Sequence, residues 1–223
     1  MIKILLGTHN TAKVKYYEQI LSGLDVALVT PGELHIVDTP REEGRNPKEN
    51  AMIKAAFYGE YADYAIGQDA ALYIRGLPFH DPRQPGLWVR RAPDGHERTD
   101  AEMIEDYAAL AHSLGGRMTC FYLDGWAVCA HGVTKGFMDT GAVNDVYAFD
   151  MVDRPHEGRH PGWPLDSLSI NRRTGRYFVE PNCRADETRY TAQEKQVIDA
   201  YTRSLRAFLV GCLGLEETER EEA

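Results

Sequence analysis

The spacing of apolar residues at the start of the chain predicts a strand followed by a helix. Residues 2–6 (IKILL) form a short apolar run that includes β-branched residues, which is typical of a buried strand. Gly7 ends this run. Asn10 or Thr11 can then cap a helix in which apolar residues recur at helical spacing as far as Leu24. The chain therefore opens with a strand, a tight turn and a helix.

Further along, cap sequences mark the starts of three more helices. These are residues 46–49 (NPKE), 99–102 (TDAE) and 191–194 (TAQE). Apolar runs predict strands at 26–29, from 65 to an end near Asp69, at 118–123, at 126–131 and over 133–143. Asp124-Gly125 is expected to form the tight turn of a hairpin between two of them.

The order of these elements predicts the domain organisation. The first part is of the strand–helix–strand type, whereas the middle part is locally antiparallel, which suggests a second lobe. Residues 76–95 and 151–162 are expected to be long irregular loops. We predict one α/β domain with two lobes over residues 1–215, followed by an acidic tail at 216–223.

Composition narrows the possible partners and the compartment. The chain has 223 residues, and its 25 basic against 34 acidic residues give a net charge of −9, which argues against binding to nucleic acid or to an anionic membrane. No apolar run is long enough for a membrane span, and we expect no signal peptide. The four cysteines form no CxxC pair, and Cys120 and Cys129 are expected to be reduced core thiols. We therefore expect a cytoplasmic protein.

The first turn carries a candidate anion site. Lys13 lies in the first turn of the predicted helix, where the helix dipole disfavours a cation unless an anion is bound. The pattern Thr8-x-Asn10-x-x-Lys13 is therefore a candidate phosphate cradle, with free backbone N–H groups beside it. The alternative is an ordinary capped helix with a solvated lysine.

Further along, charged residues gather around the second predicted helix and the strand after it. Glu42 and Glu43 precede that helix, and Lys54 lies about two turns into it. Asp69 follows at the predicted end of a strand, where α/β folds place their chemistry. Lys195 lies in the first turn of the last helix, again against the dipole.

Six stretches, in order, resemble the inosine triphosphate pyrophosphatase family, which cleaves non-standard purine nucleoside triphosphates. LLGTHNTAKVKYYEQIL is similar to the family's opening Thr-x-Asn-x-x-Lys segment, and EEGRNPKENAMIKA to its Glu-x-Gly…Glu-Asn-Ala…Lys-Ala segment. AIGQDAAL resembles its Asp-Asp-Ser-Gly-Leu motif, and QPGLWVRR its Pro-Gly turn with a following arginine. GWPLD resembles Gly-Phe-Gly-Tyr-Asp, and AQEKQVI the start of the last helix.

The resemblance implies a mixed twisted sheet flanked by helices, with a nucleotide cleft between two lobes, and a homodimer. It also implies hydrolysis of a nucleoside triphosphate, such as ITP, dITP or XTP, to a monophosphate and pyrophosphate. Hydrolysis of this kind with Mg²⁺ needs carboxylates that bind the cation and cationic groups that hold the phosphates. It also needs a base that deprotonates water. By resemblance, Thr8, Asn10, Lys13, Lys54 and Lys195 would contact phosphates. Glu42 and Asp69 would hold Mg²⁺, with Asp69 also positioning or deprotonating water. Arg91, Trp163 and Asp166 would complete the substrate contacts, Trp163 by stacking on the base.

Each of these residues also has a purely structural explanation. The alternatives are helix caps for Thr8 and Asn10, solvated charges for Lys54, Glu42, Glu43 and Arg91, turn residues for Asp69 and Asp166, and a core position for Trp163.

The chain departs from the family pattern at positions that matter for the reaction. Gln68 stands where the family has the first Asp of its acidic pair, which favours weaker metal binding. Residues 199–201 (Asp-Ala-Tyr) replace the family's Ser-His-Arg, which helps to recognise a 6-keto purine, and Pro164-Leu165 replace Gly-Tyr. We expect Tyr201 to lie in the core. Two other hypotheses therefore stay open: a pyrophosphatase with a different nucleotide substrate, and a non-catalytic nucleotide-binding module.

Overall fold

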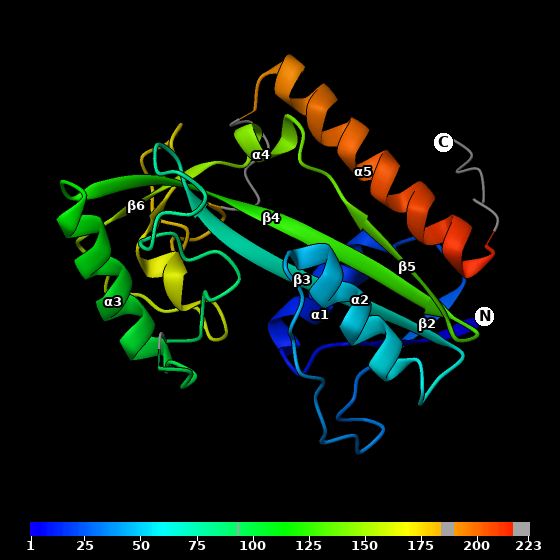
Figure 1. The fold of residues 1–223 in the computed structure, drawn as a ribbon. Coiled ribbons are helices and arrows are strands. Elements are labelled where there is room, and N and C mark those ends of the chain that lie inside the picture. The colour runs from blue at the N-terminus through cyan, green and yellow to red at the C-terminus, as the bar shows by residue number, and fades with distance from the viewer. Residues whose placement is uncertain (93, 184–189, 216–223) are drawn as a thin grey trace. The chain divides into compact units, whose positions relative to one another are not determined.

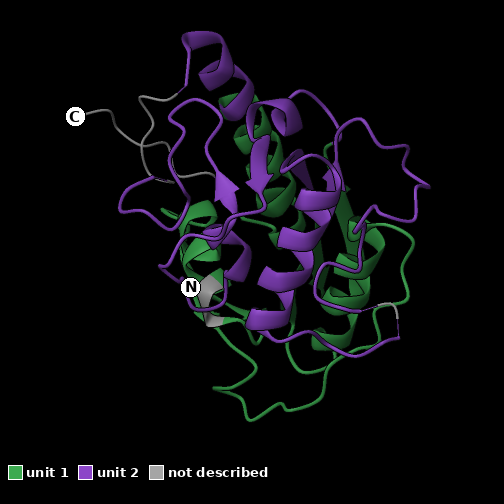
Figure 2. Cartoon of the chain, turned by 90° about the vertical axis from the view of Figure 1, so that its left-hand side faces the viewer, with its two compact units in different colours: residues 1–70, 124–139, 199–223 green, residues 71–123, 140–198 purple. Residues whose placement is uncertain are grey.

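The computed structural model describes residues 1–92, 94–183 and 190–215, which form two compact units (Figure 2). The described residues of unit 1 are 1–70, 124–139 and 199–215, and those of unit 2 are 71–92, 94–123, 140–183 and 190–198. Each unit has its own hydrophobic core.

Within the described residues, the strands form one seven-stranded sheet of order β2-β1-β3-β4-β6-β7, with β5 paired to β4 (Figure 1). Strand β1 runs parallel to β2 and β3, whereas β4 runs antiparallel to β5 and β6, and β6 to β7. The predicted mixed α/β fold is therefore confirmed. The strands are β1 (Ile2–Leu6), β2 (Val26–Val29), β3 (Tyr64–Ile74), β4 (Arg117–Ala130), β5 (Val133–Met138), β6 (Phe149–Val152) and β7 (Ser169–Ile170). The helices are α1 (Thr11–Ile20), α2 (Pro47–Tyr58), α3 (Asp100–Ser113), α4 (Val143–Val146), α5 (Ala192–Leu213) and the 3₁₀ helix η1 (Pro164–Ser167).

The helix starts follow from their cap sequences. The Asn46 side chain accepts a hydrogen bond from the Glu49 N–H (2.9 Å) at the start of α2. Thr99 and Glu102 form a reciprocal capping box at α3. At α5, Thr191 Oγ1 accepts from the Glu194 N–H (3.2 Å). These contacts satisfy N–H groups that have no partner within the helix.

In unit 1, helices α1 and α2 cover opposite faces of the sheet. Successive side chains of a strand point to opposite faces, and β4 shows this directly. Trp126 packs against Tyr17 of α1, with ring centroids 5.4 Å apart. The next residue, Ala127, lies in the core formed with Ala51 and Ala55 of α2.

Helix α5 packs on the same face of the sheet as α1 in unit 1. Figure 1 shows α5 lying along β5, and the Phe208 and Phe137 rings stack there with centroids 5.5 Å apart. Arg206 donates to the carbonyls of Ile20 and Ser22 at the end of α1. Tyr201 is buried, as predicted.

In unit 2, α3 packs against β6 and η1. The core there is apolar and gathers side chains from β3, α3, β4, β6 and η1. It consists of Leu72, Ile74, Met103, Ile104, Tyr107, Ala111, Met118, Cys120, Phe149, Met151, Leu165 and Leu168.

Four element predictions were wrong. Asp124-Gly125 is no hairpin turn, because β4 runs unbroken through it. Asp69 lies in the interior of β3 rather than at its end. The strand predicted over 133–143 is shorter and ends at Met138. Residues 151–152, expected in a loop, belong to β6, which pairs with β4.

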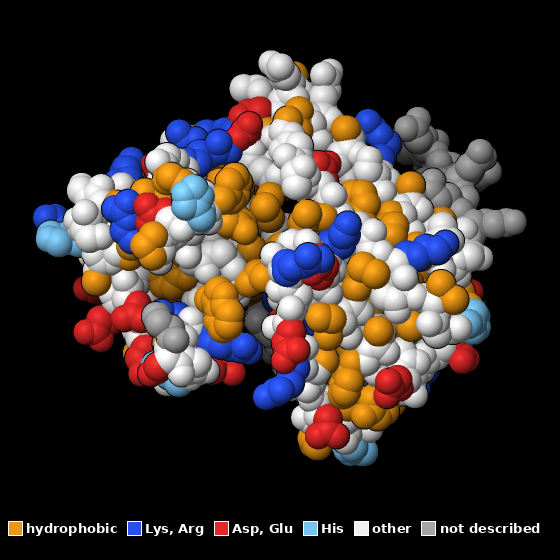
Figure 3. Space-filling model, in the orientation of Figure 1, with side chains coloured by type: hydrophobic (Ala, Val, Ile, Leu, Met, Phe, Trp, Pro, Cys, Tyr) orange, Lys and Arg blue, Asp and Glu red, His pale blue; other side chains and the backbone are white. Residues whose placement is uncertain are grey.

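The remaining sequence expectations concern thiols, surface charge and membranes. The four cysteines, all within the described residues, form no disulfide bond, and burial raises the pKa of Cys120 to about 12, so this thiol is unreactive at neutral pH. On the face drawn in Figure 3, the described basic and acidic side chains are interspersed rather than gathered into one basic surface. No helix in the described part of the chain is both long and apolar enough to cross a membrane. The predicted acidic tail lies outside the described residues.

Candidate functional site

The turn between β1 and α1 is held against β3. The Gly7 N–H donates to the Ile66 carbonyl (2.7 Å), and a Cβ at Gly7 would lie 3.0 Å from that same oxygen. Thr8 Oγ1 accepts from the Asn10 N–H (3.1 Å), and α1 begins one residue later. The predicted strand–turn–helix is confirmed, and it places the N-terminus of α1 beside β3.

Lys54 joins the two candidate metal carboxylates. Its Nζ lies 3.0 Å from Glu42 Oε2 and 3.0 Å from Asp69 Oδ1, and only 13% of its side chain is exposed. Burial acts to lower the pKa of Lys54, but the Asp69 and Glu42 carboxylates outweigh it and raise the pKa above its usual value. Lys54 is therefore a buried cation, and the alternative of a solvated helix residue is wrong.

Asn50 fixes the other oxygen of Asp69. Its Nδ2 donates to Asp69 Oδ2 (2.9 Å), and its Oδ1 accepts from the Gly44 N–H (2.8 Å). Asp69 thus has a donor on each oxygen, Lys54 and Asn50, both from α2. A Cβ at Gly67 would lie 2.2 Å from the Ala51 carbonyl oxygen, so the backbones of β3 and α2 are in direct contact here and leave no room for a side chain at position 67.

Gln68 faces the opposite side of the sheet from Asp69. Its Oε1 accepts from Lys13 Nζ of α1 (2.8 Å), and its Nε2 donates to Asp124 Oδ1 of β4 (3.0 Å). The Gln68 side chain is therefore engaged with α1 and β4, and not with the carboxylate pair that Lys54 joins. Asp124 can reach Gln68 because β4 continues through position 124 instead of turning there.

Burial affects both charged partners of Gln68. It lowers the pKa of Lys13, with Lys54 adding to the effect, although Asp69, Asp124 and Glu42 partly oppose it. Burial also raises the pKa of Asp124 to about 6, against the opposing effects of Lys13 and the Gln68 hydrogen bond. Burial thus disfavours the charged form of Lys13, and an anion bound beside it would favour that form.

Asp124 gives a prediction for stability against pH. A carboxyl whose pKa is higher in the folded than in the unfolded state loses stabilisation as pH rises through that interval. Asp124→Asn should therefore raise the free energy of unfolding more at pH 7.5 than at pH 4.5, by about 1–2 kcal/mol. Urea unfolding of both proteins at each pH measures this. The exposed Glu60→Gln controls for loss of a carboxylate, and an equal gain at both pH values would contradict the prediction.

The other predicted site residues belong to unit 2. Arg91 is exposed, and its guanidinium lies 5.3 Å from the Trp88 ring centroid. Asp166 is 3% exposed, and its Oδ2 lies 2.9 Å from His160 Nδ1. Trp163 is half-buried three residues earlier, and Lys195 is exposed in the first turn of α5. The structure thus gathers Asp166 and Trp163 in one segment, together with a histidine that the sequence reading missed.

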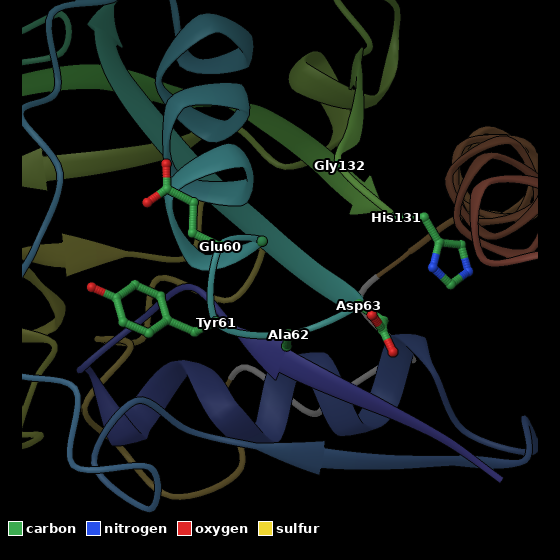
Figure 4. Close-up of a pocket in the computed structure, with 7 residues that line it drawn as sticks. Glu60, Tyr61, Ala62, Asp63, His131 and Gly132 are labelled. Carbon is green, nitrogen blue, oxygen red and sulfur yellow. The ribbon is translucent and has the colours of Figure 1, made fainter.

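A separate pocket of about 420 Å³ lies on unit 1, between the end of α2, the start of β3 and the β4–β5 turn. It is lined by residues 59–63, His131 and Gly132, and Figure 4 shows Glu60 and Tyr61 pointing away from Asp63 and His131. The lining carries two carboxylates and no lysine or arginine, so it does not suit a polyphosphate.

Sequence reading missed Asn50, Asp124 and His160. Asn50 had a signal, since it is the Asn of the Glu-Asn-Ala segment quoted for the family. Asp124 had none, because an Asp-Gly pair favours a turn. His160 gains its position only through a contact with Asp166.

These features define a mixed α/β protein in which lysines and carboxylates gather beside the start of α1 and along α2. Comparison with known families gives the particular one. The model of the Ham1 family matches residues 4–150, and this chain therefore belongs to the Ham1 family.

Relatives and solved structures agree with this assignment. The chain is 30% identical over 188 residues to the dITP/XTP pyrophosphatase of Halorhodospira halophila, covering 78% of this chain and 92% of the relative. It is 35% identical over 112 residues to that of Haemophilus influenzae, covering 49% and 54%. The Ham1 protein of Staphylococcus aureus (TM-score 0.61, 18% identity, 94% and 98% covered) and that of Coxiella burnetii (0.63, 20%, 95% and 100%) share the fold.

Proposed function

We propose that this protein is a nucleoside triphosphate pyrophosphohydrolase that cleaves a non-standard purine nucleotide to a monophosphate and pyrophosphate. Lys54 carries the proposal, because its buried ammonium holds Glu42 and Asp69 together beside the start of α1. The names of the relatives, which are dITP/XTP pyrophosphatases, support the substrate class.

The phosphate groups need positive charge and backbone donors. Lys13 and the N-terminus of α1 supply both, since Thr8 and Asn10 shape the turn from which α1 starts. The lowered pKa of Lys13 supports this role, because a bound phosphate would favour the charged form that burial disfavours. Lys195 is proposed as a further phosphate contact, from unit 2.

Glu42 and Asp69 suit a magnesium ion. Both are oxygen donors, and one oxygen of each lies 3.0 Å from the same Lys54 nitrogen, so the two carboxylates lie in the same part of unit 1. Mg²⁺ needs one or two protein carboxylates, with water and substrate phosphates as its other ligands. When bound, it would neutralise charge that builds up on the phosphate oxygens.

Asp69 is the proposed base for the attacking water. The Lys54 ammonium and the Asn50 amide each donate to one of its oxygens and hold the orientation of the carboxylate. In the reaction, the water oxygen bonds to a phosphorus of the α–β anhydride while the bridging P–O bond breaks. The water proton passes to Asp69, and the nucleoside monophosphate and pyrophosphate leave.

The base contacts are proposed in unit 2. Trp163 offers a stacking surface, Asp166 is fixed by His160, and Arg91 is free to reach a substrate from the surface. The last helix supports a changed specificity, because Tyr201 is buried and Asp199 is exposed where the resemblance implies base-reading residues. A different nucleotide substrate is therefore the second candidate. We further propose a homodimer, as the resemblance implies, and a cytoplasmic location, as the composition suggests.

Release of pyrophosphate from ITP, dITP, XTP, ATP, GTP and CTP with Mg²⁺ tests the proposal. Wild type should act on at least one of these nucleotides, and Lys54→Met should lower its kcat/KM by about 10²–10³, because two carboxylates lose their shared cation. Lys15→Met, on the exposed side of α1, is the matched control and should keep its activity.

The outcomes separate the candidates. Activity confined to inosine and xanthosine nucleotides supports the first proposal, whereas activity on another nucleotide supports the second. No pyrophosphate release from any of them, with a nucleotide still bound, would establish a non-catalytic module. Full activity of Lys54→Met would contradict the role given to the Lys54 cluster, which consists of Lys54, Glu42 and Asp69.

A further inference from the structure

A continuous set of hydrogen bonds connects three elements on the α1 face of unit 1. Lys13 Nζ donates to Gln68 Oε1 (2.8 Å), and Gln68 Nε2 donates to Asp124 Oδ1 (3.0 Å). Gln68 is 6% exposed, so its amide cannot turn freely into solvent. Lys13, Gln68 and Asp124 therefore form one chain that runs from α1 across β3 to β4.

The direction of this chain is fixed by the groups at its two ends, Lys13 and Asp124. An ionised carboxylate only accepts hydrogen bonds, whereas an amide has one accepting and one donating end. Asp124 requires the Gln68 NH₂ group on its own side, which leaves the carbonyl oxygen for the Lys13 ammonium. The Lys13 ammonium has only donors and requires the same orientation, so a neutral asparagine at position 124 would keep the order of the contacts but lose the charge that holds the Gln68 amide in place.

The surroundings hold Asp124 in this position. A Cβ at Gly125 would lie 2.2 Å from the Pro47 carbonyl carbon, so β4 is pressed against the start of α2 just after Asp124. On the other face, the buried rings of Tyr17 and Trp126 pack together. Among the described residues, neither the Tyr17 hydroxyl nor the Trp126 indole N–H has a hydrogen-bond partner. The close approach of β4 to α2 therefore fixes the backbone position from which the Asp124 side chain extends.

The charges that act on Asp124 come from α1 and β3. Lys13 favours its ionised form, and Asp69 opposes it. Burial raises the pKa of the nearby Tyr17, and the Asp69 and Asp124 carboxylates add to this effect.

We propose that Asp124 is a positioning residue for phosphate binding: through the Gln68 amide, it orients the Lys13 ammonium at the start of α1. The proposal rests on the function given above, because it assigns Lys13 to a phosphate. It also gives Gln68 a role, which is to connect Lys13 to Asp124. The family motif has a carboxylate at position 68, and in this chain Asp124 of β4 provides one instead. Asp124 does not touch the substrate, and it acts only through Gln68 and Lys13.

Binding of inorganic tripolyphosphate, measured by calorimetry without catalysis, tests the proposal. Asp124→Asn should weaken binding about tenfold in the wild-type background and less than twofold in a Lys13→Met background, because the effect passes through Lys13. A purely structural role for Asp124 would weaken binding equally in both backgrounds and would overturn the proposal.

A charge exchange gives the second test. Gln68→Glu places two carboxylates side by side and should raise KM for the best nucleotide about tenfold, with kcat within threefold of wild type. In the double variant Gln68→Glu with Asp124→Asn, the carboxylate lies at position 68 and the amide at position 124, the reverse of wild type. Its KM should return to within threefold of wild type. A double variant no better than Gln68→Glu alone would overturn the proposal.

The two proposals fail in different ways. If wild type binds tripolyphosphate but hydrolyses no nucleotide, the enzymatic function fails, and the calorimetric comparison still decides the role of Asp124. If Asp124→Asn leaves tripolyphosphate binding unchanged while nucleotides are hydrolysed, only the positioning role fails. Circular dichroism of each variant confirms that the fold is kept.

Discussion

Replacing Asp69 with asparagine is expected to lower kcat for pyrophosphate release by about 10²–10⁴, the range found for loss of a general base. Asp69 accepts from Lys54 at one oxygen and from Asn50 at the other. An asparagine of the same size keeps one of these contacts, but it turns the other into a meeting of two donors and removes the negative charge. Steady-state pyrophosphate release from the preferred nucleotide measures the change.

Asp63→Asn is the matched control, since this exposed aspartate lies just before β3. It should keep kcat within twofold of wild type. If Asp69→Asn folds normally and keeps kcat within threefold, Asp69 is neither the base nor a residue that positions water. The proposed chemistry would then need another group.

Replacing Gly125 with alanine is expected to destabilise the fold by about 3 kcal/mol, at the upper end of the usual cost of overpacking. The added Cβ would lie 2.2 Å from the Pro47 carbonyl carbon and 2.3 Å from the Lys48 nitrogen. Both are backbone atoms at the start of α2, so no side chain can move aside. Equilibrium urea unfolding measures the loss, and activity should fall with it, because Asp124 adjoins the strained position.

Gly211→Ala is the matched control for this experiment. Gly211 lies in α5, and a Cβ there would have no heavy atom within 4 Å. This substitution should stabilise the protein by about 0.5–1 kcal/mol, because alanine is the better helix former. Equal stability changes in the two variants would contradict the close approach of β4 to α2.

Local sequence signals predicted the elements whose causes are local. The run 2–6 with Gly7, and the cap residues Asn46, Thr99 and Thr191, act through neighbours in the chain, and each matches an observed strand or helix start. The positions of Thr8 and Asn10 at the first turn were accessible for the same reason.

The errors arose where packing overrides local preference. Asp124-Gly125 has the composition of a hairpin turn, but contact with α2 needs a glycine inside a continuous strand. The pairing of β6 with β4 depends on residues about thirty positions apart, so the apolar residues 151–152 gave no clear signal in an otherwise polar stretch.

For the site, residue type was predictable but grouping was not. The resemblance supplied Glu42, Lys54 and Asp69, and the structure joins them through one ammonium. It also suggested that Gln68 weakens metal binding. That effect stays a prediction. The alternation of side chains along β3 turns Gln68 towards Lys13, on the other face from Asp69.

The two-faced arrangement of β3 has an evolutionary consequence. Because adjacent residues of one strand serve different faces, a mutation at position 68 changes the surroundings of α1 and leaves the contacts of Asp69 with α2 in place. Compensation then requires a change on the same face, and β4 offers one at position 124. Two successive mutations, one at position 68 and one at position 124, can therefore move a carboxylate from β3 to β4. Lys54, Glu42 and Asp69 can stay under selection throughout.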